Sequence, residues 1–355
     1  MNVKELLESA SLAGASDIFL VAGLPLSYRL HGSIKRVSED KLLPNDTLDL
    51  VNQIYELANN RSTDRLLNTG DDDFSFALRG VSRFRVNAFK QRGSIAAVIR
   101  VITFTLPHPQ DLGIPDSIIR FGNLNKGLVL VTGPAGNGKS TTLACIVDQI
   151  NSNQEKHIIT LEDPLEFLHP HKKSIVSQRE VNLDTESYVV ALRAALRQSP
   201  DVILLGEMRD YETTNVAMTA AETGHLIFST LHTVGAANTI DRIIDVFPPN
   251  QQKQIAIQLS MVLQAVVSQQ LVPSTDGKMV AAFEIMTMTP AIRNMIRDNK
   301  TPQIDGILYA SNSPTMISMD SSLLNLYRAG QITKETALTY ASNVDMLSKK
   351  LVNAK

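Results

Sequence analysis

The chain has 355 residues, a length that predicts two globular domains. Of these residues 43% are hydrophobic and 20% charged, a balance that excludes a disordered chain. Lys and Arg number 34 against 36 Asp and Glu, so the net charge of -2 argues against a nucleic-acid partner. The single cysteine, Cys145, excludes an intramolecular disulfide and a cysteine-rich zinc site, and its apolar neighbours predict a buried, inert thiol.

The first residues, MNVKELLESASLAGASD, carry acids where a signal peptide needs a long apolar run. No uninterrupted run approaches the roughly 18 apolar residues of a membrane helix. The sequence therefore predicts a cytoplasmic protein that associates with a membrane only through partners.

Residues 1–102 are predicted to form a small α+β domain with an antiparallel sheet. Helical spacing of apolar residues predicts helices at 3–13 and 46–58. Alternating patterns predict the strands, at 16–23, 26–37, 71–78 and 82–102.

Residues 103–115 contain three prolines and a glycine and are predicted to be a linker. In the following domain, 116–355, long apolar segments separated by helical patterns predict a mainly parallel sheet buried on both faces. These segments are GLVLVTG, HIITLED, DVILLGE and HLIFSTLHT. From Gln251 onward a mostly helical region is predicted, with 251–269 as its longest helix.

The strongest motif is GPAGNGKS, which fits the phosphate-loop pattern G-x-x-x-x-G-K-S between a predicted strand and a predicted helix. Backbone amides of such a loop surround phosphate oxygens at a helix N-terminus. Lys139 would reach the β- and γ-phosphates, and the Ser140 hydroxyl would bind Mg²⁺. The predicted nucleotide contacts are Gly133, Pro134, Ala135, Gly136, Asn137, Gly138, Lys139, Ser140 and Thr141.

Acidic residues follow two of the predicted strands. Glu162 and Asp163 end one apolar strand, and Glu207 ends another, where Gly206 occupies the place of the usual metal-binding Asp. The carboxyl ends of parallel strands meet at one edge of a sheet, so these acids would face the nucleotide. The alternative is that each is the solvated end of a core strand.

Two histidines flank a fourth apolar strand. The spacing of His225 and His232 puts them on opposite faces, which argues against joint metal binding. His232, at the far end of the strand, is the better candidate for hydrogen bonding to a γ-phosphate, whereas His225 could simply satisfy the start of the strand.

The segment SRFRVNAF alternates Arg83, Arg85 and Asn87 with apolar residues. This pattern is typical of a half-buried sheet with a solvated basic face. A second interpretation is that the arginines approach an anion, as arginines of neighbouring subunits do in motor ATPases. The spacing alone leaves both interpretations open.

The ordered motifs GPAGNGKSTT, TLEDPLEF, RQSPDVILLGEMRD and TGHLIFSTLHT resemble the Walker A motif, Asp box, Walker B motif and His box of the type II secretion and type IV pilus ATPases. From Ala15 to Gly330 the chain is most similar to the type IV pilus retraction (twitching motility) ATPases, the PilT family. The resemblance implies an α/β fold in which a PAS-like N-terminal domain precedes a RecA-like ATPase domain. It also implies a hexameric ring with ATP at the domain and subunit interfaces.

The resemblance further implies roles in ATP and Mg²⁺ binding and in hydrolysis for residues of all four motifs and of the N-terminal domain. These residues are Lys139 and Ser140 (Walker A), Glu207 (Walker B), Glu162 and Asp163 (Asp box), His232 and His225 (His box), and Arg83, Arg85 and Arg100. In this family Gly206 is the normal Walker B residue, so the missing Asp is no defect. Whether Glu207 or Glu162 is the general base stays open. Ala135, Asn137 and Phe19 depart from the family pattern, and no role of the family's His at position 19 carries over.

The direction of motion follows from two further features. Extension and type II secretion ATPases of this superfamily typically carry paired CxxC motifs for zinc, which a chain with one cysteine lacks. The segment AIRNMIRDNK resembles the retraction signature AIRNLIRE, with conservative changes at Met295 and Asp298. We therefore expect an ATP-driven hexamer that retracts a type IV pilus, docked on the inner-membrane platform protein at the cytoplasmic side. The alternatives are an extension or type II secretion ATPase, and an accessory, nucleotide-gated retraction homologue with little turnover.

Overall fold

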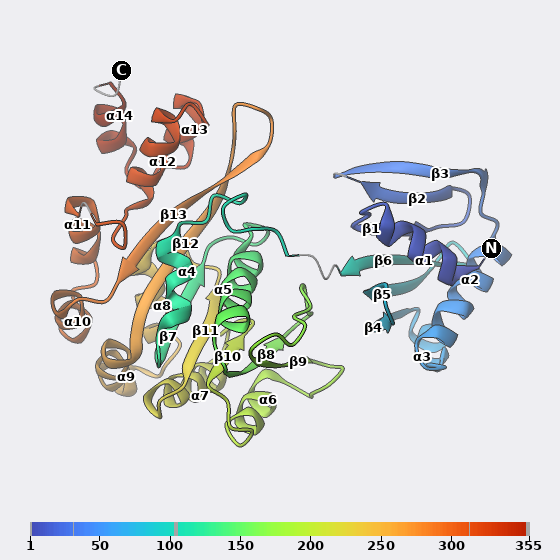
Figure 1. Ribbon diagram of the computed structural model, residues 1–355, viewed down its shortest axis with the longest axis horizontal. Coiled ribbons are helices and arrows are strands. Elements are labelled where there is room, and N and C mark those ends of the chain that lie inside the picture. The colour runs from blue at the N-terminus through green and yellow to red at the C-terminus, as the bar shows by residue number, and fades with distance from the viewer. Residues whose placement is uncertain (1, 31, 103–105, 312, 353–355) are drawn as a thin grey trace. The chain divides into compact units, whose positions relative to one another are not determined.

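The computed structural model describes residues 2–30, 32–102, 106–311 and 313–352. It divides into two compact units: residues 1–105 with 165–168, and residues 106–164 with 169–355. The first three residues of the predicted linker, 103–105, lie outside the described residues, and 106–115 belongs to the second unit. Figure 1 shows the two units, the first mainly in blue to teal and the second mainly in green to red.

The first unit is built on an antiparallel six-stranded sheet with strand order β3-β2-β1-β6-β5-β4. Its strands are β1 (Asp17–Leu20), β2 (Pro25–Leu30), β3 (Ser33–Lys41), β4 (Asp71–Leu78), β5 (Ser82–Gln91) and β6 (Ser94–Ile102). Its helices are α1 (Val3–Leu12), α2 (Pro44–Leu57) and α3 (Asp64–Thr69). Buried residues of the helices, such as Leu7 and Ile54, share one core with strand residues such as Ile18 and Phe84. The helices therefore cover one face of the sheet and leave the other to polar side chains.

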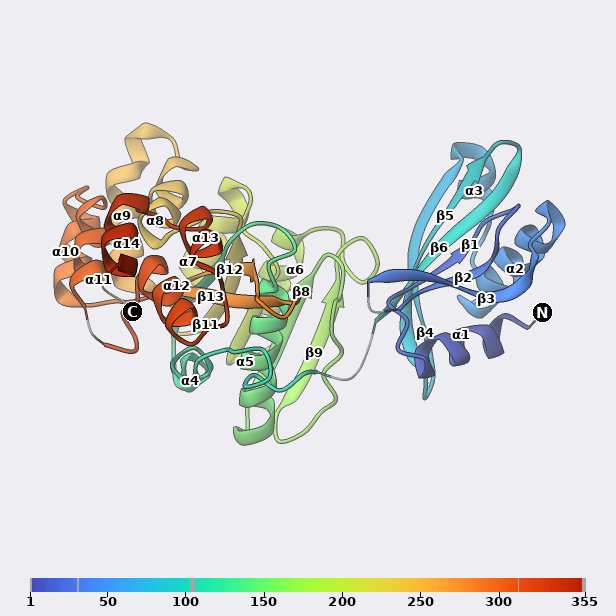
Figure 2. The same ribbon diagram turned by 90° about the horizontal axis from the view of Figure 1, so that it is seen from above.

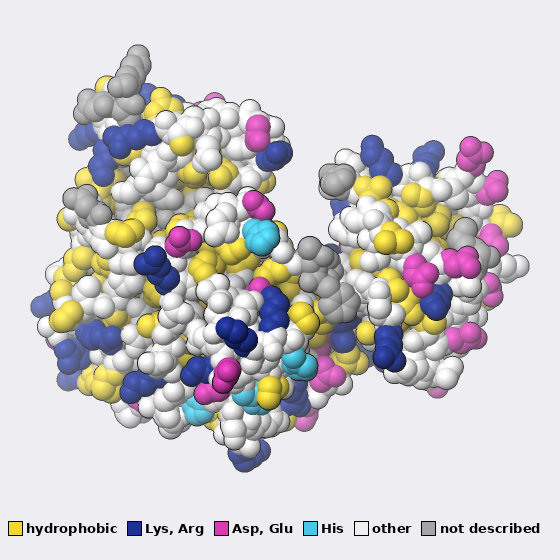
Figure 3. Space-filling model, in the orientation of Figure 1, with side chains coloured by type: hydrophobic (Ala, Val, Ile, Leu, Met, Phe, Trp, Pro, Cys, Tyr) yellow, Lys and Arg dark blue, Asp and Glu magenta, His cyan; other side chains and the backbone are white. Residues whose placement is uncertain are grey.

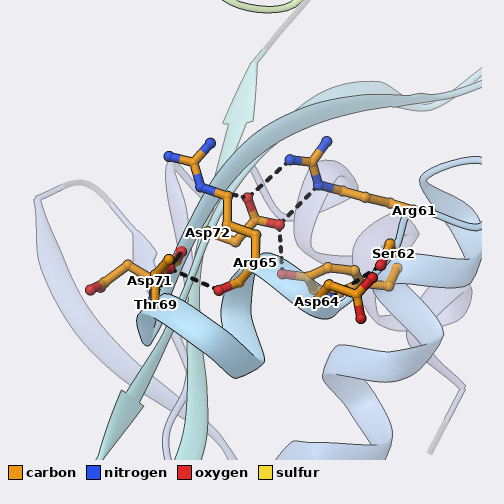
Figure 4. A network of polar contacts seen from close by, with 8 residues as sticks. Arg61, Ser62, Asp64, Arg65, Thr69, Asp71 and Asp72 are labelled. Carbon is orange, nitrogen blue, oxygen red and sulfur yellow. Dashed lines mark hydrogen bonds and ion pairs between the residues drawn. The ribbon is translucent and has the colours of Figure 1, made fainter.

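Asp72 on β4 is the centre of a buried polar network (Figure 4). Its carboxylate accepts two hydrogen bonds from Arg61, each 2.9 Å long, and one of 2.9 Å from the Tyr55 hydroxyl. Arg65 adds an ion pair at 3.7 Å. Burial alone would raise the pKa of Asp72, but the hydrogen bonds from Arg61 and Tyr55 and the neighbouring positive charges lower it below its ordinary value. The network thereby ties α2 and α3 to the edge of the sheet.

We expect Asp72→Asn to lower the free energy of unfolding of this unit by about 3 kcal/mol at pH 7, because it leaves Arg61 partly buried without its counter-charge. Because the folded pKa lies below the unfolded value of 3.8, the stability from Asp72 is present above that pH and is lost as pH falls through the lower folded value. Urea unfolding of wild type and variant from pH 7 to pH 3 measures both effects. Asp71→Asn, at the exposed neighbouring position, is the control. A difference between wild type and Asp72→Asn that does not shrink below about pH 4 would contradict the assignment.

The second unit is built on a seven-stranded sheet with strand order β13-β12-β7-β11-β10-β8-β9. The strands are β7 (Gly127–Thr132), β8 (His157–Glu162), β9 (Ile175–Glu180), β10 (Val202–Leu205), β11 (Leu226–Leu231), β12 (Leu263–Pro273) and β13 (Met279–Thr287). All neighbours are parallel except β12 and β13. The central strands β7, β10 and β11 are buried along their whole length, which explains their unbroken apolar sequences.

Helices cover both faces of this sheet, as Figure 2 shows. One face packs against α4 (Asp116–Ile119), the short helix Arg120–Asn123 and α5 (Lys139–Asn153). The other packs against α6 (Tyr188–Ala195), α7 (Tyr211–Glu222), α8 (Ala236–Asp245) and α9 (Pro249–Val262). The remaining helices follow β13: α10 (Pro290–Arg297), α11 (Gln303–Ala310), α12 (Met319–Arg328), α13 (Lys334–Thr339) and α14 (Val344–Val352).

The predicted long helix 251–269 is wrong in its second half. Helix α9 ends at Val262, and Leu263 begins β12, which pairs with β7 at the centre of the sheet. A strand buried on both faces has no alternating pattern, so the periodicity of LQAVVSQQLVP could not be distinguished from that of a buried helix. The sequence also gave no prediction for β9 or β13. The error matters because β12 lies beside the phosphate loop.

The predicted α/β class, with an antiparallel-sheet domain before a mainly parallel one, is confirmed. Within the described residues, no helix combines the length and the apolar character needed to cross a membrane. On the face in Figure 3, basic and acidic side chains are interspersed with hydrophobic ones.

Candidate nucleotide-binding site

The phosphate loop connects β7 to α5, and its glycines are required by geometry. Gly136 and Gly138 have φ values of +77° and +76°, in the left-handed region that favours glycine. Gly133 is needed for close approach, because a Cβ atom there would lie 2.1 Å from the carbonyl oxygen of Gln269. The loop therefore packs directly against β12.

Lys139 is the first residue of α5 and is 8% exposed. Its Nζ donates to the carbonyl oxygens of Gly133, at 2.8 Å, and Pro134, at 2.9 Å. The ammonium group thus lies over the loop, where phosphate oxygens would bring stronger, charged acceptors. Ser140 follows on the first turn of α5 and is half-buried.

Gln269 on β12 is a site residue that sequence reasoning missed, because its segment was predicted to be helical. Its Oε1 accepts a hydrogen bond of 2.7 Å from the Thr142 hydroxyl on α5, and its side chain is 3% exposed. A Cβ atom on Gly138 would lie 2.9 Å from its Nε2. Two residues on, the amide of Leu271 donates to Asn137 Oδ1 at 2.7 Å. The strand β12 therefore holds both ends of the phosphate loop.

The carboxyl ends of β8, β10 and β11 lie side by side beyond the phosphate loop. Leu161, Leu205 and Ser229 are in register across the three strands, so Glu162 and Glu207 follow at the same edge. The loop after β10 is fixed by two hydrogen bonds of Gly206. Its amide donates to Leu161 at 2.8 Å, and its carbonyl accepts from the Thr230 hydroxyl at 2.6 Å.

The structure brings Glu207 and His232 together. The Glu207 Oε2 lies 3.5 Å from His232 Nε2 and accepts a 2.5 Å hydrogen bond from Arg209. The Glu207 side chain is 16% exposed, whereas that of His232 is 49% exposed. At the end of β8, Glu162 is half-buried and Asp163 is exposed. A partly buried carboxylate beside an imidazole can orient water or a metal-bound water.

His225 lies at the opposite end of β11, and the structure does not bring it to the phosphate loop. Its Nδ1 lies 3.0 Å from the carbonyl oxygen of Ala220 and 3.2 Å from the Thr223 hydroxyl, so it satisfies the start of the strand. The other acids of DVILLGEMRD are structural: Asp201 accepts from the His157 amide at 2.8 Å, and Asp210 caps α7.

Tyr188, which sequence reasoning also missed, is the first residue of α6 and lies against this acidic edge. A Cβ atom on Gly206 would be 2.7 Å from the Tyr188 hydroxyl oxygen. Burial raises the pKa of the phenol, and the charges of Glu207, Asp163 and Glu162 raise it further. The hydroxyl therefore stays protonated and can donate a hydrogen bond. A single tyrosine far from any motif gave no sequence signal.

The loop after His232 is held by a directly opposed pair of residues on β12 and β13. The Ser268 hydroxyl accepts from the Gly235 amide at 3.0 Å, and Glu284 accepts from the next amide, that of Ala236, at 2.8 Å. The other carboxylate oxygen of Glu284 accepts from the Met319 amide at 3.3 Å. Burial raises the pKa of Glu284, opposed by these two hydrogen bonds. One carboxyl group thus joins the starts of α8 and α12.

The predicted arginines lie in the first unit, separate from the unit that holds the phosphate loop. Arg85 makes a bidentate pair with Asp73, with Nε–Oδ1 and Nη2–Oδ2 distances of 3.0 and 2.6 Å. Arg83 lies two residues earlier on the same face of β5. Burial alternates along β5, which confirms the predicted strand pattern.

Arg100 belongs to a row of charged residues that crosses four strands of this sheet. In register, Arg85 opposes Arg100, Arg100 opposes Asp17, and Asp17 opposes Arg29. Asp17 pairs with Arg29 at 3.2 Å and with Arg100 at 3.3 Å. The Arg100 side chain remains 65% exposed, so it is available to an anion from outside the unit.

The donor atoms near the loop fit a magnesium ion held mainly by a nucleotide. Among the described residues the Ser140 hydroxyl makes no hydrogen bond, and Glu207 offers a carboxylate across the same edge. Mg²⁺ in nucleotide sites takes one or two protein oxygens and completes its shell with phosphates and water. Within the described ranges no group of three or more His, Cys, Asp or Glu side chains could hold a metal without a nucleotide.

Comparison with known proteins agrees with this geometry. A model of the type II/IV secretion system protein family matches residues 1–318. The chain is 45% identical over 337 residues to the type IV pilus retraction ATPase PilT of Pseudomonas aeruginosa, covering 95% of this chain and 97% of that protein. It is 43% identical over 349 residues to a twitching motility protein of Neisseria gonorrhoeae, covering 98% of this chain and 92% of that protein.

A solved structure gives the same result for the fold. The crystal structure of the pilus retraction motor PilT with bound ADP matches with a TM-score of 0.90 and 46% identity, covering 98% of this chain and 99% of that one.

Proposed function

The chain belongs to the type II/IV secretion system protein family and, within it, to the type IV pilus retraction ATPases, and from this membership we propose that a hexamer of it retracts a pilus by Mg²⁺-dependent ATP hydrolysis. The observation that carries the proposal is the arrangement of side chains at one edge of the sheet of the second unit. There the phosphate loop with Lys139 lies on the same side as Glu207 and His232, which are 3.5 Å apart. A nucleotide bound by this loop would lie beside groups able to activate water, as phosphoryl transfer to water requires.

The proposed chemistry is attack of water on the γ-phosphate, in which positioning and charge neutralisation supply most of the rate enhancement. Backbone amides of residues 133–141 bind the phosphates, and Lys139 leaves the carbonyls of Gly133 and Pro134 for the β- and γ-phosphate oxygens. Glu207, or Glu162 beside it, accepts a proton from the attacking water. His232 hydrogen bonds to the γ-phosphate and so connects it to the loop that follows β11.

The Ser140 hydroxyl and, directly or through water, Glu207 would hold Mg²⁺. Bound there with ATP, the ion would neutralise charge on the phosphate oxygens. Asp163, exposed at the end of β8, would complete the polar surroundings of the nucleotide.

In the proposed hexamer, Arg83, Arg85 and Arg100 reach a nucleotide held by the second unit. Arg85 and Arg100 would then exchange Asp73 and Asp17 for phosphate oxygens, which bind guanidinium groups at least as strongly. We propose that the ring docks on the inner-membrane platform protein of the pilus machine at the cytoplasmic side. We propose no role for His225 beyond the start of β11.

Pilus number in a deletion strain tests the direction of movement. We expect cells without this chain to carry excess pili and to lose twitching, and cells complemented with Lys139→Ala to look the same. Bald cells would contradict retraction and favour an extension or secretion ATPase. If the chain is instead an accessory retraction homologue with little turnover, the deletion strain should show normal pilus dynamics. The purified protein should then hydrolyse ATP no faster than Lys139→Ala.

A further inference from the structure

Gly206 is a glycine although its backbone does not require one. Among the described residues its φ value is not in the positive range that favours glycine. The space beside it is occupied instead. A Cβ atom at this position would lie 2.7 Å from the Tyr188 hydroxyl oxygen and 3.2 Å from the Leu161 carbonyl oxygen. The Tyr188 hydroxyl therefore takes the place that a side chain at position 206 would fill.

Tyr188 is held in this place by the start of α6. Ser187 caps the helix by accepting a hydrogen bond from the Val190 amide, so the backbone of the first helical residue is fixed. The ring packs against the core under the sheet. A phenol ring has few rotatable bonds, so a fixed backbone and a packed ring also fix its hydroxyl.

The hydroxyl has a free hydrogen and acidic surroundings. It makes no hydrogen bond to any other residue in the part of the chain that the structure describes, so its contact with Gly206 is one of packing. The negative charges of Glu207, Asp163 and Glu162 all act on it. The peptide that it touches, Gly206–Glu207, is the one that carries the Glu207 carboxylate.

We propose that Tyr188 is a positioning residue of the hydrolytic site: its hydroxyl takes the place of a side chain at position 206 and, packed against Gly206, holds the loop that places the carboxylate of Glu207 at the edge of the sheet. This inference rests on the proposed ATPase site. The direct consequence is that Tyr188 and Gly206 act as a pair, because either an added methyl group at 206 or a lost hydroxyl at 188 changes the same contact.

Tyr188→Phe removes one oxygen atom and keeps the ring. We expect kcat for ATP hydrolysis to fall about tenfold, because the loop that carries Glu207 loses the oxygen atom packed against Gly206 and its position becomes less well fixed, with KM for ATP and the melting temperature unchanged. Tyr211→Phe is the matched control. Tyr211 is likewise the first residue of a capped helix, and its hydroxyl contacts Gln251 instead of the site, at 3.2 Å.

Gly206→Ala completes a double-mutant cycle. In the wild-type background we expect it to lower kcat about a hundredfold, because no Cβ atom tolerates an oxygen at 2.7 Å and the loop with Glu207 must shift. In the Tyr188→Phe background the oxygen is gone, so Gly206→Ala should lower kcat by no more than about threefold further.

Equal losses from Gly206→Ala in both backgrounds would overturn the inference, as would a Tyr188→Phe protein with wild-type kcat. A fall in melting temperature that accounts for the lost activity would also overturn it, because the role would then be structural. Failure of the ATPase site itself is distinguishable: the wild-type rate would then equal that of Lys139→Ala, and Tyr188→Phe could not lower it.

Discussion

Lys139→Ala is expected to lower kcat for ATP hydrolysis about a thousandfold. The ammonium group of Lys139 neutralises the negative charge that develops on the phosphate oxygens in the transition state, and the variant lacks this group. The fold should survive. Lys139 donates to two carbonyls of its own loop, and α5 keeps its packing against β7. Phosphate release by the purified hexamer, with the melting temperature measured in parallel, checks both statements.

The control for this variant is Lys126→Ala. Lys126 is exposed and lies just before β7, at the opposite end of the same strand from the phosphate loop. The Lys126→Ala protein should hydrolyse ATP at the wild-type rate. If wild type and Lys139→Ala release phosphate equally slowly, the proposal that this protein is an ATP-driven motor is contradicted.

Glu207→Gln is expected to lower kcat at least a hundredfold while ATP binding stays within about threefold of wild type, because an amide cannot accept the proton of the attacking water. The substitution keeps the size of the side chain but weakens its 2.5 Å contact with Arg209 and its 3.5 Å contact with His232. Single-turnover hydrolysis and equilibrium binding of a fluorescent ATP analogue separate the two effects.

Glu222→Gln is the control for charge alone, since Glu222 is exposed at the far end of α7. Collapse of nucleotide binding in Glu207→Gln would show that Glu207 mainly holds the metal, and wild-type hydrolysis would transfer the base role to Glu162. Glu162→Gln, measured in the same way, decides between the two acids.

The parts of the site that could be predicted are those fixed by local chemistry. The phosphate loop was recognisable because its glycines, Lys139 and Ser140 are adjacent in sequence and because the left-handed positions tolerate little else. The strand ends carrying Glu162, Glu207 and His232 were recognisable because buried parallel strands have long apolar sequences.

The residues that escaped prediction contact the site from distant segments. Gln269 was hidden by the same property that revealed β7 and β11: a strand buried on both faces shows no period, and its length resembled a helix. Tyr188 and Glu284 depend on which elements pack together, and no local pattern encodes that. The partners of the arginines, Asp17 and Asp73, follow from sheet register, which the sequence of a single strand does not specify.

Two neighbouring residues of β12, Ser268 and Gln269, limit how parts of the site can move relative to one another. Neighbouring side chains of a strand point to opposite faces, so Gln269 binds Thr142 in the first turn of α5, directly after the phosphate loop, while Ser268 on the other face binds the loop after His232. The peptide bond between them has a fixed length, so this strand sets the spacing of the two loops. A motion that separates the start of α5 from the loop after His232 therefore has to break one of two hydrogen bonds to β12, that of Thr142 with Gln269 or that of Gly235 with Ser268.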